Sequence, residues 1–108
     1  MTYPIRITSA AWRDLEEICI WIAENDSPEN ATRVLDRIME TVEGVSKLPH
    51  RGTRPRELPA GLEAEYRQVL FKPYRIIYEV ARTEVVIHLI ADGRRNLRSL
   101  LFRRLIGG

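Results

Sequence analysis

The stretch EYRQVLFKPYRIIYEVARTEVVIHLIADGRR, residues 65–95, carries the strongest structural signal in the chain. Runs of β-branched and aromatic residues are separated there by Lys72-Pro73 and by a short polar connection. The pattern predicts three adjacent β-strands, over residues 66–71, 74–80 and 84–91. The last predicted strand leads directly into Arg94 and Arg95, so the sheet should present two cations at its end.

The connection at Arg82-Thr83 sets the expected register between the second and third of these strands. A two-residue turn there predicts three facing apolar pairs: Val80 with Val85, Tyr78 with Ile87, and Ile76 with Leu89. The other face is then expected to carry Arg75, Ile77, His88 and Ile90. Arg82-Thr83 lacks the Gly or Asn that tight hairpin turns favour, so the register depends on matching the apolar faces.

Composition limits the class of protein. A chain of 108 residues is expected to form a single domain over residues 1–108. With 44% hydrophobic and 30% charged residues it is typical of a soluble globular protein. No apolar run approaches the roughly 20 residues that span a bilayer. The beginning MTYPIRIT has no basic-then-apolar signal pattern, so we expect a cytoplasmic protein.

The two halves of the chain differ in charge. Residues 1–47 hold five Lys/Arg and nine Asp/Glu, whereas residues 48–108 hold twelve and six. All but one of those twelve are arginines. The basic half therefore favours an anionic partner.

The N-terminal half predicts a strand and two helices. Residues 3–8 alternate as a short strand, and Ser9 is expected to cap a helix over residues 10–24. Trp12 and Trp21 flank the apolar stripe of this helix, and we expect them to pack at the edges of the core rather than to form a binding platform.

A second helix and a long loop follow. Ser27 as N-cap and Pro28 at the first position predict a helix over residues 28–47. The two amphipathic helices form a hairpin whose apolar stripes need the sheet to cover them. Residues 48–63 contain three prolines and two glycines, so a loop is expected, and residues 96–106 predict a short C-terminal helix.

The order of these elements, with several short motifs, resembles the RelE/ParE superfamily of toxins from bacterial type II toxin–antitoxin pairs. The motifs are A-x-x-D-L-x-x-I-x-x-W-I (residues 11–22), L-P-x-x-G (48–52), Y-R-I-I-Y (74–78) and the D-G-R-R-N-L-x-x-L-L ending (92–101). Each motif alone has a packing explanation, and the ordered set carries the resemblance. The Gly-Arg-Arg followed by a leucine-bearing tail is most similar to the ParE-like plasmid-stabilisation group.

The resemblance implies an α+β fold in which the helical hairpin packs on one face of a small antiparallel sheet, with a short C-terminal helix. It also implies a ParD-like antitoxin as partner, in a toxin–antitoxin hetero-oligomer. A tail that is disordered alone can lay apolar residues along a groove and carboxylates beside arginines.

Two toxic activities occur among such relatives. A RelE-like, ribosome-dependent mRNA endoribonuclease needs a general base, a proton donor and cations around the phosphate. The candidates for that alternative are Arg67, Arg75 and His88, although no Tyr or His follows His88. His50 and Glu57 lie in the loop as possible bases, but nothing in the spacing directs them toward Arg75.

A ParE-like inhibitor of DNA gyrase needs a binding surface and no acid or base, and this is the favoured hypothesis. It implies no catalytic residue, cofactor or metal site. The expected partner-binding residues are arginines of the loop, the sheet and the tail: Arg51, Arg54, Arg56, Arg75, Arg94, Arg95 and Arg98. Two alternatives stay open: Arg98 and Arg103 only solvate the last helix, and Arg75 pairs with Glu79 or Asp92 inside the fold. A nucleic-acid-binding or scaffold protein is a third, less favoured class.

Overall fold

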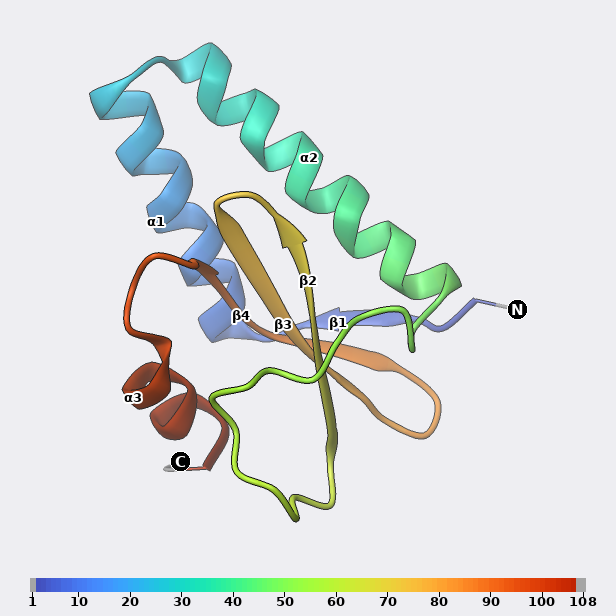
Figure 1. The fold of residues 1–108 in the computed structure, drawn as a ribbon. Helices are drawn as coiled ribbons and strands as arrows, with labels where there is room; N and C mark the ends of the chain where they lie inside the picture. The colour runs from blue at the N-terminus through green and yellow to red at the C-terminus, as the bar shows by residue number, and fades with distance from the viewer. Residues whose placement is uncertain (1, 107–108) are drawn as a thin grey trace.

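The computed structural model of the chain describes residues 2–106 (Figure 1). Its elements, in chain order, are β1 (Ile5–Ile7), α1 (Ser9–Asn25), α2 (Pro28–Lys47), β2 (Glu65–Phe71), β3 (Tyr74–Val80), β4 (Val85–Asp92), α3 (Leu97–Leu101) and a π-helical turn η1 (Phe102–Ile106). The expected strands and helices are all present, with bounds shifted by one or two residues. The C-terminal helix differs in one respect, because its second half widens from α to π geometry.

The four strands form one sheet in the order β1-β4-β3-β2. β2, β3 and β4 are antiparallel neighbours, as expected, and a tight turn with a cis Lys72–Pro73 peptide bond joins β2 to β3. β1 pairs with β4 in parallel, which makes the sheet mixed. Parallel neighbours need a long connection, and here α1, α2, β2 and β3 lie between the two strands.

The helical hairpin begins and turns at polar caps. Ser27 accepts a hydrogen bond from the Asn30 amide and Pro28 opens α2, as predicted. The α1 cap is Thr8, whose hydroxyl accepts from the Ala11 amide at 3.1 Å, so the expectation of Ser9 was wrong by one residue. Thr8 directly follows the last residue of β1, Ile7, and keeps an extended backbone, which is the conformation of an N-cap residue.

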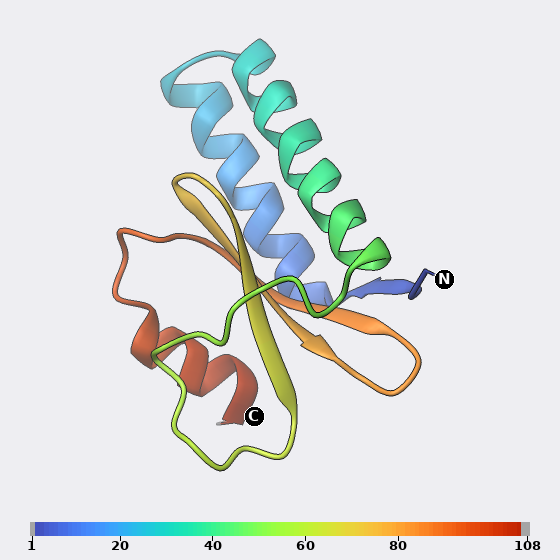
Figure 2. The same cartoon turned by 45° about the vertical axis from the view of Figure 1, so that its right-hand side comes forward.

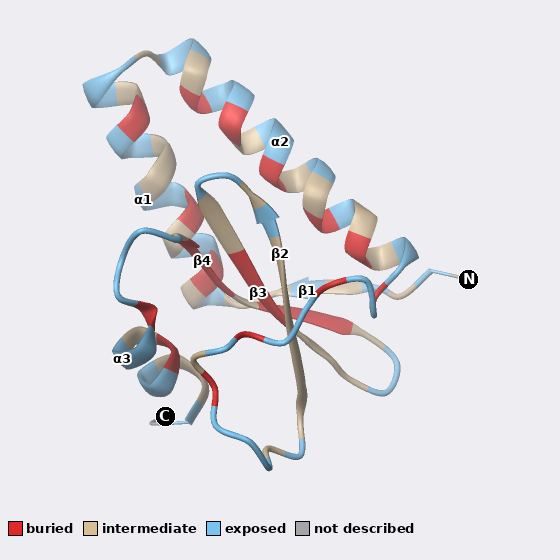
Figure 3. Cartoon of the chain, viewed as in Figure 1, coloured by how far each residue is buried: buried red, intermediate tan, exposed pale blue. Residues whose placement is uncertain are grey.

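The two faces of the sheet are covered by different parts of the chain (Figures 1 and 2). On the hairpin face, α1 and α2 pack against Ile76, Tyr78, Val85, Ile87 and Ile90. Figure 3 shows the buried residues gathered along the inner sides of both helices and through the central strands. The predicted hairpin-on-sheet arrangement is confirmed.

The opposite face, which we call the C-terminal face, has its own smaller core. Ile77, Leu89 and Ala91 of the sheet are buried there beneath α3 and the long loop. The covering side chains are Leu97 and Leu101 of α3 and Leu58 of the loop. Both faces of this small sheet therefore carry a covered apolar core, which is unlike a sheet with one solvated side.

The register between β3 and β4 shifts at a β-bulge. Val80 faces Val85 and Tyr78 faces Ile87 as predicted, but Ile77 then faces Leu89, so His88 is an extra residue in β4. Because side chains alternate along a strand, the extra residue moves Leu89 to the C-terminal face and Ile90 to the hairpin face. The predicted pairing of Ile76 with Leu89 was wrong, and Ile76 faces Ile90 instead.

The loop of residues 48–64 is fastened at its beginning by Tyr78. The buried hydroxyl donates to the Pro49 carbonyl at 2.8 Å and accepts from the Gly52 amide at 3.1 Å. A side chain at Gly52 would overlap the Gln68 carbonyl oxygen and the Tyr78 hydroxyl, so this close approach requires glycine. No helix within residues 2–106 is long and apolar enough to cross a membrane.

We predict that Tyr78→Phe lowers the free energy of unfolding by about 2 kcal/mol, because it leaves a buried amide and a buried carbonyl without partners. Urea unfolding followed by circular dichroism measures the difference. Tyr66→Phe is the matched control, since no hydrogen bond of the Tyr66 hydroxyl occurs within residues 2–106, and its effect should stay within about 0.5 kcal/mol. Equal stabilities for the two variants would contradict this role of Tyr78.

Candidate partner-binding interface

Arg75 is held in an ion pair beneath the long loop. Its guanidinium donates to both carboxylate oxygens of Glu57, at 2.6 and 2.8 Å, and its Nε donates to Gln68 Oε1 at 2.7 Å. The two charged side chains are only 12% and 13% exposed. The sequence analysis proposed Glu79 or Asp92 as the ion-pair partner of Arg75, and both were wrong. It did not predict Glu57 in this role. Arg75 is therefore a fastening of the loop and is not free to contact a partner.

Glu57 is a poor general base in this position. The hydrogen bonds from Arg75, set against partial burial, lower the pKa of Glu57 from 4.5 to about 2. A carboxylate with so low a pKa accepts a proton only weakly near neutral pH. Although Glu57 meets Arg75, which sequence spacing did not indicate, the pair lacks the basicity that proton abstraction from a 2′-hydroxyl requires.

Arg67 lies on the other side of the sheet from Arg75. It faces Tyr78 in the register of β2 and β3 and donates to the Gly52 carbonyl at 2.5 Å, on the hairpin face. Its Nε also donates to Glu65, which in turn lies 2.7 Å from His50 Nδ1. The two sheet cations expected to act together on a phosphate are thus separated by the sheet itself.

His88, the bulged residue, belongs to a third cluster. Its Nε2 lies 2.9 Å from Glu79 Oε1, and its ring meets the ring of Tyr66 edge-on with centroids 5.9 Å apart. Glu79 stands four residues from Arg75 along β3, about 13 Å at roughly 3.3 Å per residue. His88 therefore forms no hydrogen bond with Arg75. His50, which lies against Glu65 on the hairpin face, forms none either.

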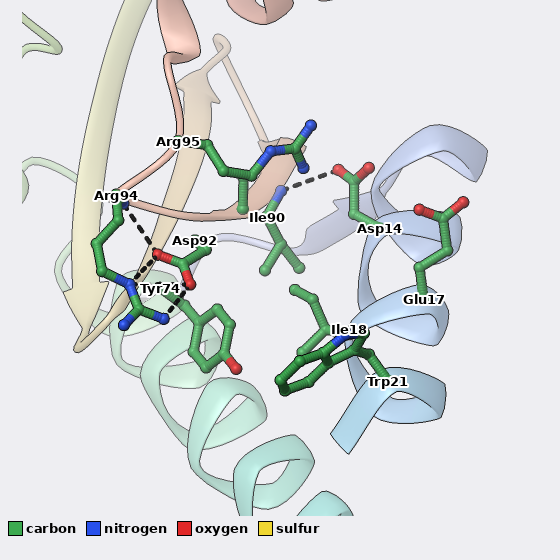
Figure 4. Close-up of a pocket in the computed structure, with 10 residues that line it drawn as sticks. Asp14, Glu17, Ile18, Trp21, Tyr74, Ile90, Asp92, Arg94 and Arg95 are labelled. Atoms are coloured by element: carbon green, nitrogen blue, oxygen red, sulfur yellow. Dashed lines mark hydrogen bonds and ion pairs between the residues drawn. The ribbon is translucent and has the colours of Figure 1, made fainter. Parts of the chain in front are cut away.

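A cleft opens between α1 and the end of β4, and we call it the α1–β4 cleft (Figure 4). Its volume is about 350 Å³. Ile18 and Trp21 of α1 form one wall, and Tyr74 lies opposite them. Trp21 is 63% exposed and Trp12 is 49% exposed, so the expectation that both pack at the edge of the core was wrong. The apolar stripe of α1 is narrow enough that both indoles fall outside it.

Charged groups surround the α1–β4 cleft, and most of them are already paired. Arg94 donates to the Asp92 carboxylate through Nε and Nη2, and this contact lowers the pKa of Asp92. The Arg95 and Glu17 side chains also line the cleft, and neither forms an ion pair or side-chain hydrogen bond within residues 2–106. The neighbouring Arg94 and Arg95, which the sequence treated alike, therefore differ: Arg94 pairs with Asp92 at the surface, whereas Arg95 has no ion pair within residues 2–106.

Asp14 is a residue whose role the sequence analysis missed. Its carboxylate accepts from both terminal nitrogens of Arg104, at 2.8 and 3.0 Å, and from the Ile90 amide at 3.0 Å. Arg104 also donates to the His88 carbonyl at 2.7 Å. A signal was present, because Asp14 stands at helical spacing between Ala11 and Ile18, where an acidic side chain faces inward and needs a partner.

A second hollow, the loop–helix groove, lies between the long loop and the C-terminal helical segment. Its volume is about 280 Å³. Arg56 of the loop and Arg98 of α3 line it, together with Phe102 and Ile106 of η1. Phe102 is 57% exposed, and neither arginine forms an ion pair within the described residues. This groove joins positive charge with exposed apolar surface.

The two remaining predicted residues lie apart from both hollows. Arg54 donates to the Leu58 and Pro59 carbonyls and so braces the loop internally. The Arg51 guanidinium lies against Gly44 in the last turn of α2. The structure thus brings Arg56 together with Arg98, and Arg94 together with Arg95, and it leaves Arg51, Arg54 and Arg75 outside both groups.

Comparison with known proteins fits this geometry. The profile of the ParE toxin of the type II toxin–antitoxin system parDE matches residues 5–97. Toxin ParE3 from Caulobacter vibrioides is 31% identical over 91 residues, which are 84% of this chain and 87% of that relative.

Two solved structures share the fold. The chromosomal ParDE toxin–antitoxin system from P. aeruginosa superimposes with a TM-score of 0.71 and 23% identity, covering 84% of this chain and 96% of that one. The toxin–antitoxin complex RelBE2 from Mycobacterium tuberculosis gives 0.61 and 25%, covering 85% and 99%. The fold is that of the RelE/ParE superfamily of toxins. Within it, the chain belongs to the ParE toxin family of type II toxin–antitoxin systems.

The ion pair between Arg75 and Glu57 predicts a pH-dependent stability. Because the pKa of Glu57 falls from 4.5 to about 2 on folding, its contribution is complete above pH 4.5 and is lost as the pH falls toward 2. Glu57→Gln should therefore lower the free energy of unfolding by about 3 kcal/mol at pH 7, and by much less near pH 2.

Urea unfolding of the wild type and the Gln variant at several pH values measures this difference. Glu63→Gln is the control, because Glu63 is an exposed carboxylate of the same loop, and its effect should stay within about 0.5 kcal/mol at every pH. A Glu57→Gln deficit of the same size at pH 7 and pH 2 would show that the pair is not ionic.

Proposed function

We propose that this toxin inhibits DNA gyrase by binding and that a ParD-like antitoxin encoded beside it neutralises it. The observation that carries the proposal is that the possible acids and bases are engaged away from available arginines. Glu57 is bound to Arg75 with a lowered pKa, His50 lies against Glu65, and His88 lies against Glu79. A binding inhibitor needs none of these groups, and it acts in the cytoplasm, where gyrase meets DNA.

The loop–helix groove is the surface we assign to the target. Arg56 and Arg98 supply two cations that have no ion-pair partner within residues 2–106, and Phe102 supplies an exposed aromatic ring. Interfaces commonly owe most of their energy to a few aromatic and arginine side chains in a partly enclosed site. Gyrase, or the DNA that gyrase holds, offers the acidic chemistry that complements this groove.

A ribosome-dependent endoribonuclease is the second candidate, and one observation favours it. Tyr66, His88 and Glu79 lie together on the C-terminal face, which is a combination able to move protons. Against it, Arg67 and Arg75 lie on opposite faces of the sheet and both are engaged with oxygens of the chain itself. No cation of the sheet is thus left to stabilise a phosphorane beside His88.

The test is an in vitro supercoiling assay with purified gyrase and relaxed plasmid. We expect the protein to abolish supercoiling and to accumulate cleaved plasmid, and we expect added antitoxin to restore activity. Cells that express the toxin alone should filament and induce the DNA damage response. Cleaved ribosome-bound messages with undisturbed supercoiling would favour the ribonuclease instead.

We predict that the double variant Arg56→Ala/Arg98→Ala inhibits supercoiling at least ten-fold less potently, because it removes both arginines that line the groove. Arg82→Ala is the matched control: Arg82 is an exposed arginine of the turn between β3 and β4, and its loss should leave potency unchanged. Circular dichroism verifies that each variant is folded. Full potency in the double variant would move the target surface away from the groove.

A further inference from the structure

We infer that the α1–β4 cleft is the seat of one apolar anchor side chain of the antitoxin, with an acidic side chain of the same segment placed against Arg95. The inference deepens the antitoxin part of the proposed function and does not depend on the identity of the toxin's target. It separates the antitoxin's anchor from the loop–helix groove that we assign to gyrase.

The apolar content of the cleft is the first argument. Trp21 extends from α1 into the open cleft, with Ile18 behind it and the Tyr74 ring facing it (Figure 4). An indole that is 63% exposed remains hydrated until a partner covers it, so an apolar side chain inserted here would remove apolar surface from water on both molecules. Partly enclosed Trp and Tyr side chains are typical anchors of protein interfaces.

The charges of the cleft are the second argument, because they are balanced and not predominantly basic. Three carboxylates line it, those of Asp14, Glu17 and Asp92, against the guanidinium groups of Arg94 and Arg95. Because Arg104 already pairs with Asp14, positive and negative charges balance here, and phosphate groups would find no surplus of cations, unlike at the loop–helix groove. The complement of such a site is a peptide with an apolar side chain and few charges of each sign.

Only certain charges in the cleft are available to a partner. Asp14 forms an ion pair with Arg104, and Asp92 forms one with Arg94. Of the two arginines that line the cleft, Arg95 is the one without an ion pair in residues 2–106, and Glu17 is the lining carboxylate without one. An acidic side chain of the partner therefore gains most at Arg95, whereas one placed at Arg94 would compete with Asp92.

The dimensions of the cleft favour an extended segment as the occupant. A volume of about 350 Å³ accommodates side chains and is too small to receive a folded element. A segment that is disordered when free can insert single side chains into such clefts as it wraps a surface. The antitoxin is the partner for which the family resemblance implies such a segment.

The experiment measures the affinity of the purified, full-length antitoxin for full-length toxin variants in two matched pairs. Trp21→Ala and Arg95→Ala alter the cleft. Trp12→Ala removes the other exposed tryptophan of α1, and Arg103→Ala removes an exposed arginine of η1; both residues lie outside the cleft. We expect each cleft variant to bind at least ten-fold more weakly by isothermal titration calorimetry, and each control to bind within about three-fold of wild type, since exposed residues away from an anchor contribute little.

A spectroscopic readout reports directly on the cleft. The chain has two tryptophans, so Trp12→Phe leaves Trp21 as the single indole of the toxin. Addition of antitoxin should shift the Trp21 emission to the blue as the indole loses water. The complex of the double variant Trp12→Phe/Trp21→Phe supplies the background from any indole of the antitoxin.

Three outcomes overturn the inference. One is wild-type antitoxin affinity in both cleft variants, and another is an unshifted Trp21 emission in the saturated complex. The third is a loss of gyrase inhibition by the cleft variants with antitoxin affinity intact, which would assign the cleft to the target. A toxin that never inhibits gyrase would contradict the proposed function only, because the affinity measurement requires no target.

Discussion

A sheet with two apolar faces has to be covered on both sides, and this constraint organises the whole molecule. The helical hairpin covers one face, and the loop with α3 and η1 covers the other. On the C-terminal face, each cover is held by an ion pair in addition to its apolar contacts. Arg75 with Glu57 holds the loop, and Arg104 with Asp14 holds the end of the chain. Breaking such pairs by removing one partner is costly, because the other charge is left poorly solvated.

Because several arginines form intramolecular ion pairs, only some of the others are available to bind a partner. An arginine-rich half suggests a broad cationic surface, but the pairs above consume several of its charges. Arg54 donates hydrogen bonds to loop carbonyls, and Arg94 pairs with Asp92. Three of the arginines without an ion pair in residues 2–106 lie in two separate hollows, Arg95 beside Trp21 and the pair Arg56 and Arg98 beside Phe102. A toxin that must be recognised by an antitoxin and by a target gains from having two different surfaces.

The sequence predicted the elements well because they depend on local chemistry. Ser27 and Pro28 begin α2 by capping rules, and strand alternation identified β2 to β4. The bulge at His88 was not predictable from apolar alternation, since a one-residue insertion leaves the composition of each strand unchanged. Ion-pair partners were harder still. Glu57 and Arg75 are eighteen residues apart, and only the path of the loop decides that they meet.

The central claim is that this protein acts by occupying its target and not by turning over a substrate. Titration of a fixed concentration of gyrase with the toxin tests it most directly, with supercoiling followed over time at each ratio. The account predicts inhibition that depends on the molar ratio of toxin to gyrase, saturates near stoichiometric amounts and does not grow with incubation. Inhibition that continues to increase with time at a small fraction of the gyrase concentration would reveal turnover and contradict the account.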